Sequence, residues 1–182
     1  MNKAVIGPGL GLALAAPLVA LAGPLIPSTP ELGKAEGRCR AGESGPALLV
    51  NVAGIKDRKG NLKLEVYPSN DEDFLADDNI LVSAGKTFRR VEMAVPASGN
   101  VQVCVRIPGP GTYSISVLHD RDANRKFGLS VDGIGFTGNP KLGMRKPKAA
   151  ATRLAVSSGG VSQTTIVMNY RKGLMSFGPL SQ

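Results

Sequence analysis

The sequence predicts an all-β protein, an antiparallel β-sandwich of about seven strands with an immunoglobulin-like arrangement. Short segments in which apolar and polar residues alternate recur between residues 47 and 170 of the 182-residue chain. This period of two places one face of each segment on a core, as in a half-buried strand. Glycine- and proline-rich turns separate the segments, and no stretch has the apolar spacing of a long helix.

Seven segments are expected to form strands, and in chain order they are 47–52, 62–66, 89–95, 101–107, 113–117, 152–156 and 165–170. The fourth shows the alternation clearly, because valines and an isoleucine occupy every second position from Val101 to Ile107. Lys59-Gly60-Asn61 predicts a hairpin turn between the first two strands. The run 108–111 (Pro-Gly-Pro-Gly) predicts a reversal before the fifth strand, and 157–160 (Ser-Ser-Gly-Gly) separates the last two.

Two segments interrupt the alternation. Residues 70–78, N-D-E-D-F-L-A-D-D, are expected to form a surface loop or one helical turn, with Phe74 and Leu75 capping the sandwich. Residues 119–147 are expected to form a long connection, and the glycines around Ile134 and Phe136 are interpreted as flexible turns. Long ordered loops in compact domains are often functional, so we expect the working surface in this connection, over residues 119–140.

The N-terminus has the form of a secretory signal peptide, with Lys3 before an apolar run over residues 4–26. Ala20-Leu21-Ala22 fits a cleavage site, and Gly33-Lys34-Ala35 is a second candidate. A retained membrane anchor is the alternative, but three prolines make the run a poor spanning helix. We therefore expect residues 1–35 to hold the signal peptide and an N-terminal arm, and residues 36–182 to form a single β-sandwich domain.

On this interpretation the mature protein has no transmembrane span and lies in the periplasm or outside the cell. Cys39 and Cys104 are the only two cysteines. In an oxidising compartment such a distant pair predicts one structural disulfide. Because Cys104 shares a strand face with Gln102 and Arg106, the disulfide is expected to pin the N-terminal arm outside the central core.

The formal net charge of +8 is unevenly distributed, because no Asp or Glu follows Asp132. The residues after Asp132 include seven basic ones: Lys141, Arg145, Lys146, Lys148, Arg153, Arg171 and Lys172. Such a region can attract an anionic envelope surface, including phospholipid or lipopolysaccharide headgroups, and a plain solvated face is the alternative. Nucleic acid is not an expected partner, because export separates the protein from it. The absence of Trp also leaves few aromatic rings on which bases could stack.

Asp120, Asp122 and Asn124 have the spacing of the first three ligands of a calcium loop. The sixth position, however, holds Arg125 instead of Gly, and the twelfth holds Val131 instead of Glu. No cofactor is therefore expected, and calcium is the one ion that this spacing could bind. The alternative is that these side chains accept hydrogen bonds from backbone amides of the loop, as Asx-turns do.

His119 is the only histidine and continues the apolar face of the strand at 113–117. Packing at the end of the sandwich, with a hydrogen bond to a loop carbonyl, is the expected role. A hydrolase that uses His119, Asp120 and Asp122 is an alternative, and Asp132 is a further candidate ligand of this loop. A single histidine excludes a His-rich zinc site, and no G-x-S-x-G motif supplies a nucleophile.

The runs G-T-Y-S-I-S-V-L-H-D-R-D-A-N and D-G-I-G-F-T-G-N-P, followed by a strand ending in Asn169-Tyr170, resemble a bacterial secreted family catalogued as domain of unknown function 2141. The resemblance covers residues 47–170. It implies a β-sandwich of the transthyretin or carboxypeptidase-regulatory type and an exported protein, and it implies no activity.

From these observations we expect an exported protein without enzymatic activity that acts as an envelope-associated binding or accessory module. Its partner is expected to be an anionic envelope surface or another protein. A calcium-stabilised structural module is the alternative function.

Overall fold

The computed structural model describes residues 26–180 except 41, 43, 144 and 175. Within this part of the chain the elements are β1 (Ala47–Ala53), β2 (Asn61–Pro68), α1 (Asp78–Ser83), β3 (Arg89–Ala94), β4 (Gln102–Arg106), β5 (Gly111–Asp120), β6 (Gly133–Phe136), the 3₁₀ helix η1 (Ala149–Thr152), β7 (Arg153–Val156), β8 (Val161–Val167), β9 (Asn169–Lys172) and β10 (Ser176–Pro179). The expected signal segment, residues 1–25, lies outside the described residues. No helix among the described residues is long and apolar enough to cross a bilayer.

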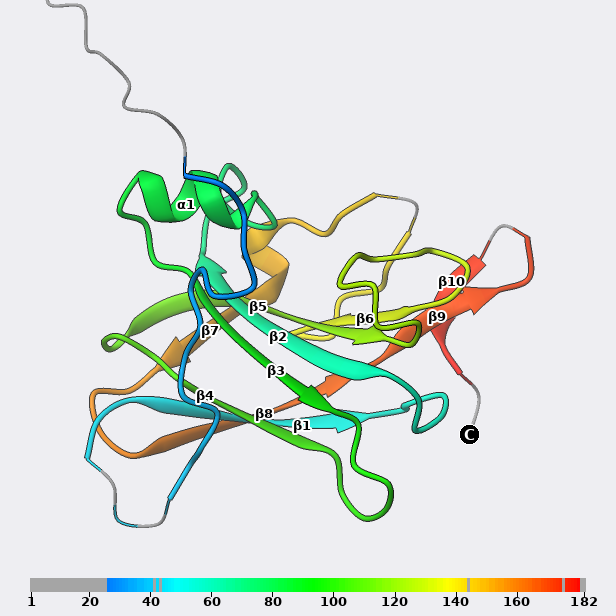
Figure 1. Cartoon of the computed structure of the whole chain (residues 1–182), viewed down its shortest axis with the longest axis horizontal. Helices are drawn as coiled ribbons and strands as arrows, with labels where there is room; N and C mark the ends of the chain where they lie inside the picture. Colours follow the sequence, from blue (N-terminus) through cyan, green and yellow to red (C-terminus); the bar gives the residue numbers. More distant parts are fainter. Residues whose placement is uncertain (1–25, 41, 43, 144, 175, 181–182) are drawn as a thin grey trace, which may run out of the picture.

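The strands form two sheets, which Figure 1 shows one above the other. The larger sheet has the order β10-β9-β6-β5-β2-β3, and β7 pairs with the first half of β5. The smaller sheet has the order β4-β1-β8. The prediction of an all-β sandwich is therefore confirmed. One pair departs from the antiparallel pattern, because β1 and β8 run parallel. β8 follows β7, which belongs to the other sheet. No hairpin joins β8 to β1, so the two strands are not constrained to be antiparallel.

The core lies between the sheets, as the alternation predicts. From the larger sheet Leu62, Leu64 and Val66 of β2 are fully buried, and Leu48 and Val50 of β1 meet them from the smaller sheet. Fully burying an aliphatic side chain of this size contributes about 1.5–3 kcal/mol, so these ladders are the main source of stability.

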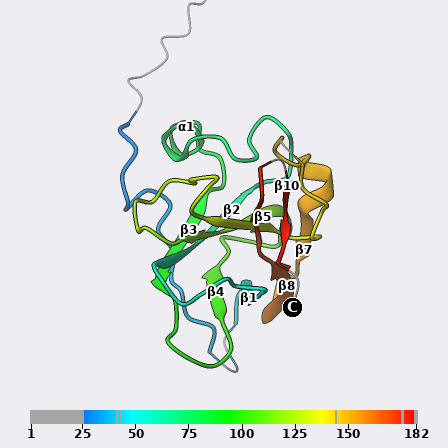
Figure 2. The same ribbon diagram turned by 90° about the vertical axis from the view of Figure 1, so that its right-hand side faces the viewer.

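A second cluster, called here the outer core, lies on the outward face of the larger sheet. It consists of Tyr67, Phe74, Leu81, Phe88, Phe136 and Ala149. Phe74 is fully buried and packs edge-on against the rings of Tyr67 and Phe136, with centroids 5.7 Å apart in each pair. Phe74 and Leu75 were expected to cap the sandwich, but they pack on the outward face of the larger sheet and not against the core between the sheets. Helix α1 lies over one end of the larger sheet, as Figures 1 and 2 show.

The structure corrects the predicted strand number, since ten strands form within the described residues. β6 lies inside the expected long connection, and β10 follows the last predicted strand. The single strand predicted at 165–170 is divided between β8 and β9, which belong to different sheets. The flexible-turn interpretation of residues 133–136 is wrong. A side chain at Gly133 would collide with the ring of Tyr170 at 2.2 Å, and one at Gly135 with Ile166 at 2.5 Å. These glycines allow β6 to lie against the core, so their role is close packing.

The predicted hairpin at Lys59-Gly60-Asn61 is also wrong, because β1 and β2 belong to different sheets. The turns at 108–111 and 157–160 likewise join strands of different sheets, β4 to β5 and β7 to β8. The turn residues correctly mark where the chain reverses, but each reversal carries the chain across the sandwich.

A disulfide joins Cys39 to Cys104, with the two Cα atoms 5.7 Å apart, so that prediction is confirmed. Cys104 lies on β4 between the core valines and outside the core cluster, which agrees with the expected pinning of the arm. The arm runs along the edge of the sandwich, where the Ala35 amide donates to the Arg90 carbonyl at 2.8 Å. Disulfides persist in oxidising compartments and are rare in the cytosol, so this bond indicates an oxidising environment.

Candidate functional site

His119 is fully buried at the end of β5, on the face that looks into the sandwich. Its Nε2 lies 2.8 Å from the carbonyl oxygen of Lys59, which can only accept, so Nε2 carries the proton. Nδ1 then accepts from the hydroxyl of Tyr170 at 2.7 Å, and that hydroxyl accepts from the amide of Lys56 at 3.0 Å. Burial lowers the pKa of His119, so the imidazole is neutral. The histidine holds a loop carbonyl, as expected, and has no free nitrogen for a substrate.

Asp120 follows His119 and points the opposite way, into the β5–β6 loop (residues 121–132). Its two oxygens accept from the amides of Asn124 at 3.1 Å and Arg125 at 2.8 Å. Asp132 closes the other end of the loop by accepting from the amides of Arg121 and Gly128. These carboxylates therefore fix the conformation of the loop by accepting its backbone amides. This is the alternative to calcium binding that the sequence also allowed.

The expected cation ligands come together only in part. Asp120, Asp122 and Asp132 each offer an oxygen within 4.8 Å of the others. The Oδ1 of Asn124, the other expected ligand atom, accepts from the amide of Lys126 at 2.8 Å. Arg121 ties the base of the loop to Asp57 of the β1–β2 connection, and the guanidinium lowers the pKa of the Asp57 carboxyl.

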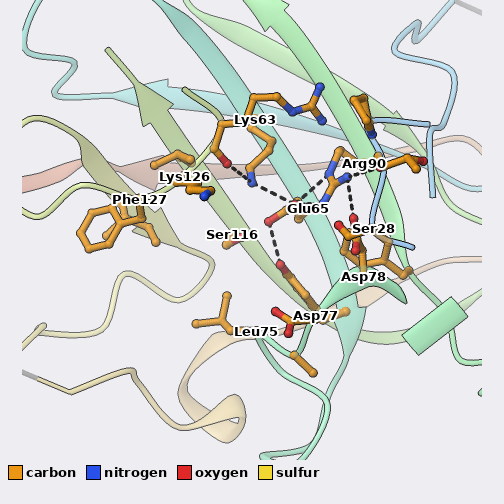
Figure 3. Close-up of a pocket in the computed structure, with 18 of the residues that line it drawn as sticks. Ser28, Lys63, Glu65, Leu75, Asp77, Asp78, Arg90, Ser116, Lys126 and Phe127 are labelled. Carbon is orange, nitrogen blue, oxygen red and sulfur yellow. Dashed lines mark hydrogen bonds and ion pairs between the residues drawn. The ribbon is translucent and has the colours of Figure 1, made fainter. Parts of the chain in front are cut away.

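Beside this loop lies a cleft of about 650 Å³ on the outward face of the larger sheet. Its floor is formed by outward-facing residues of β2, β3, β5 and β6: Lys63, Glu65, Arg90, Ser116, Leu118 and Ile134. Figure 3 labels the first four of them. Its walls are residues 124–127 of the β5–β6 loop, residues 75–78 at the start of α1, and residues 28–30 of the arm. The volume lies in the range typical of small-molecule sites, about 300–1,000 Å³.

Ion pairs organise one end of the cleft. Arg90 is buried and donates through Nε to Glu65 at 2.9 Å, while its Nη1 lies 3.0 Å from Asp78. Lys63 lies 3.3 Å from the same Glu65 oxygen. Tyr67 donates to the second oxygen of Glu65 at 2.7 Å. Burial and the neighbouring carboxylate raise the pKa of Tyr67 well above its usual value, so its hydroxyl remains a donor.

The other end of the cleft is apolar. Leu75, Phe127 and Ile134 line both the cleft and a neighbouring cavity of about 220 Å³. That cavity is otherwise lined largely by apolar side chains, with Arg145 and Lys146 at its margin. The two hollows together form a surface with an ionic end and an apolar end. Such an arrangement suits a ligand that has a polar head and an apolar body.

The residues of the cleft floor were not among the sequence-predicted candidates. Lys63, Glu65 and Arg90 occupy outward positions of predicted strands, where charged residues are the rule on a solvated face. The alternation could assign them to one face of one sheet. It could not show that the β5–β6 loop and the arm fold over them.

No curated protein and no solved structure matches the chain. The profile of a bacterial protein family, described as an uncharacterized protein conserved in bacteria (DUF2141), matches residues 50–164. The matched segment is more than half of the 182 residues and runs from β1 into β8. It includes β5, the β5–β6 loop and most of the cleft floor. The chain therefore belongs to the DUF2141 family of bacterial proteins, as its resemblance to that family predicted.

Proposed function

We propose that the protein is an exported, envelope-associated binding module without enzymatic activity, and that the cleft binds a small amphiphilic molecule of the envelope. The cleft itself carries the proposal: it has a preformed ionic end at Lys63, Glu65 and Arg90, and an apolar end at Phe127 and Ile134. A ligand with a polar head and an apolar body would contact both ends.

Binding is favoured over hydrolysis by the positions of the candidate catalytic groups. His119 is 0% exposed, and both its ring nitrogens are in hydrogen bonds within the fold. Asp120 and His119 are adjacent on one strand, so their side chains leave opposite faces and cannot act on one substrate atom. Asp120 is 2% exposed and already accepts two loop amides.

Export is supported by the disulfide and by the signal-like N-terminus. The arm also bears on where the signal ends. Residues 28–30 line the cleft, and the backbone of Arg90 donates to the Gly33 carbonyl at 2.7 Å. Cleavage after Ala35 would remove these contacts. Of the two candidate sites, these contacts favour Ala22, and we propose cleavage there.

The test is native mass spectrometry of the mature protein after incubation with an organic extract of a bacterial envelope. Asp77→Trp adds a bulky ring at the mouth of the cleft, where Asp77 is exposed and makes no helix-capping hydrogen bond. Glu72→Trp is the matched control, because Glu72 lies in the same segment, is exposed and does not line the cleft. We expect a bound species with the wild type and the control and none with Asp77→Trp. Equal binding by all three proteins, or by none, would contradict the proposal.

A further inference from the structure

Most of the exposed large apolar side chains in the described part of the chain lie on two loops, one of which borders the cleft. Phe127, Leu129 and Val131 of the β5–β6 loop are 44%, 40% and 37% exposed, and Leu174 of the β9–β10 turn is 83% exposed. These four residues are called here the docking edge. They are most of the exposed large hydrophobics in the described part of the chain, and the others are Ile26 and Ile80. Exposed apolar groups gathered in this way mark a surface that meets a partner.

The two loops of the docking edge are held together. The rings of Phe127 and Phe177 meet edge to face with centroids 6.0 Å apart. Arg171 donates to the Ser130 hydroxyl at 3.4 Å and to the carbonyls of Gly173 and Leu174. Figure 1 shows the β5–β6 loop beside β9 and β10. The fold therefore presents these apolar side chains outward on a fixed framework.

Basic residues surround the docking edge. Lys126 is exposed on the β5–β6 loop and Lys172 at the end of β9, and Arg145 and Lys146 are exposed where they line the adjoining cavity. Asp122 is the one exposed carboxylate of the β5–β6 loop, and its Oδ2 accepts from the Asn124 amide group at 2.8 Å. No acidic residue follows Asp132 in the chain. The charge around the edge is therefore predominantly positive.

We propose that the docking edge binds the surface of an anionic phospholipid bilayer, an inference that rests on the proposed export and envelope association. The apolar side chains of the two loops enter the interfacial region, and the surrounding lysines and arginines contact the headgroups. Apolar anchors combined with cations are what peripheral attachment to an anionic membrane requires, because neither contribution alone holds a protein firmly. Docking in this way would bring the mouth of the cleft to the membrane, where amphiphilic ligands are found.

The test is co-sedimentation of the mature protein with vesicles of phosphatidylglycerol mixed with an equal amount of phosphatidylcholine, and with vesicles of phosphatidylcholine alone. The test variant combines Val131→Ser and Leu174→Ser, and neither residue lines the cleft or the adjoining cavity. The control is Ile80→Ser, which removes a 47% exposed isoleucine from α1, outside the docking edge. Circular dichroism and the melting temperature establish that each variant is folded.

We expect the wild type and Ile80→Ser to bind the anionic vesicles, with binding that weakens as salt is raised. The double variant should bind at least about tenfold more weakly, since two apolar anchors are lost. Lys172→Glu should also bind more weakly and respond less to salt. Wild-type protein that ignores anionic vesicles, or a double variant that binds as well as the control, would overturn the inference.

These outcomes are separate from those of the cleft experiment. If the vesicles do not bind but Asp77→Trp loses the envelope-derived ligand, the docking edge is refuted and the binding module stands. If the protein binds vesicles through the docking edge but Asp77→Trp does not change ligand retention, the docking edge stands and the ligand-binding cleft is refuted. Binding to native membranes that disappears after their proteins are digested, with no binding to lipid vesicles, would assign the edge to a protein partner and refute membrane docking.

Discussion

The hydroxyl of Tyr170 on β9 donates a hydrogen bond to Nδ1 of His119 on β5, across a distance of 2.7 Å. The same hydroxyl accepts from the amide of Lys56, and the other nitrogen of the imidazole donates to the carbonyl of Lys59. One buried chain of hydrogen bonds thus joins two strands of the larger sheet to the β1–β2 connection. The only histidine of the protein is a structural residue in this arrangement.

Replacing Tyr170 with Phe tests that arrangement. The change removes the hydroxyl and leaves Nδ1 of His119 and the Lys56 amide without their partner inside the protein. We expect the free energy of unfolding to fall by about 1–3 kcal/mol, the usual cost of an unsatisfied buried polar group. Urea denaturation measures it. Unchanged stability would show that the hydrogen bonds do not hold the sheet to the loop.

The pH dependence of stability follows from the buried imidazole. Burial holds the pKa of His119 below its usual value of 6.5, so the unfolded chain takes up a proton before the folded protein does. The free energy of unfolding should therefore fall as the pH drops below about 6.5, by up to about 1.4 kcal/mol per pH unit. Lowered carboxyl pKa values, such as that of Asp57, act only in the more acidic range below their usual 3.8.

Urea denaturation between about pH 7.5 and pH 5 isolates the histidine, because the other shifted groups do not titrate there. In His119→Gln the decrease in the free energy of unfolding with falling pH should disappear over this range, whatever the absolute stability of the variant. A slope that persists in His119→Gln would assign the effect to other groups and contradict the assignment.

The two ends of the β5–β6 loop should respond differently to loss of charge. Asp132 is buried and accepts from two loop amides, so Asp132→Asn should lower the free energy of unfolding by about 1–3 kcal/mol. Asp122 is exposed, and Asp122→Asn should leave stability nearly unchanged. Equal effects of the two substitutions, measured by thermal unfolding, would show that the amide contacts do not organise the loop.

Calcium should not raise the melting temperature. The oxygens of Asp120 and Asp132 already accept four loop amides, and Asn124 faces another amide. Thermal unfolding with added calcium, compared with a chelator, checks this directly, because a ligand of the folded state raises the melting temperature. A rise with calcium that Asp122→Asn abolishes would establish the cation site instead.

The N-terminus of the exported protein should precede Ser28. Residues 28–35 contribute to the cleft and pair with β3 at Arg90. A protein that begins at residue 36 should lose about 2 kcal/mol of stability, since it lacks both backbone hydrogen bonds to Arg90. Mass spectrometry of secreted protein gives the terminus, and a mature form that starts at residue 36 would contradict the account.

Alternation predicted the strands well where each face had a distinct environment. β2 is the clearest case, because Leu62 and Leu64 enter the core while Lys63 and Glu65 face outward. β6 escaped prediction because its inward positions are Gly133 and Gly135, which carry no side chain for a pattern to register. The pairing of strands also escaped, since a turn such as Lys59-Gly60-Asn61 looks the same within a sheet and between sheets.

The candidate site was predictable only in its loop. The single histidine and the nearby aspartates predicted a role for His119, Asp120 and Asp132. In the structure these three side chains accept or donate hydrogen bonds that hold loop backbone groups. The cleft beside them depends on contacts between segments far apart in sequence, such as Lys63 Nζ donating to the Arg125 carbonyl at 3.2 Å. Contacts between distant segments produce no residue pattern that can be recognised in a single sequence.

Amide hydrogen exchange of the mature protein, measured with and without envelope extract, tests most directly whether the cleft is the working surface. We expect slower exchange in peptides that cover residues 75–78, 116–118 and 124–127, and unchanged exchange in β4 and β8 of the smaller sheet. Slower exchange confined to β4 and β8, or no change anywhere at saturating extract, would contradict the account.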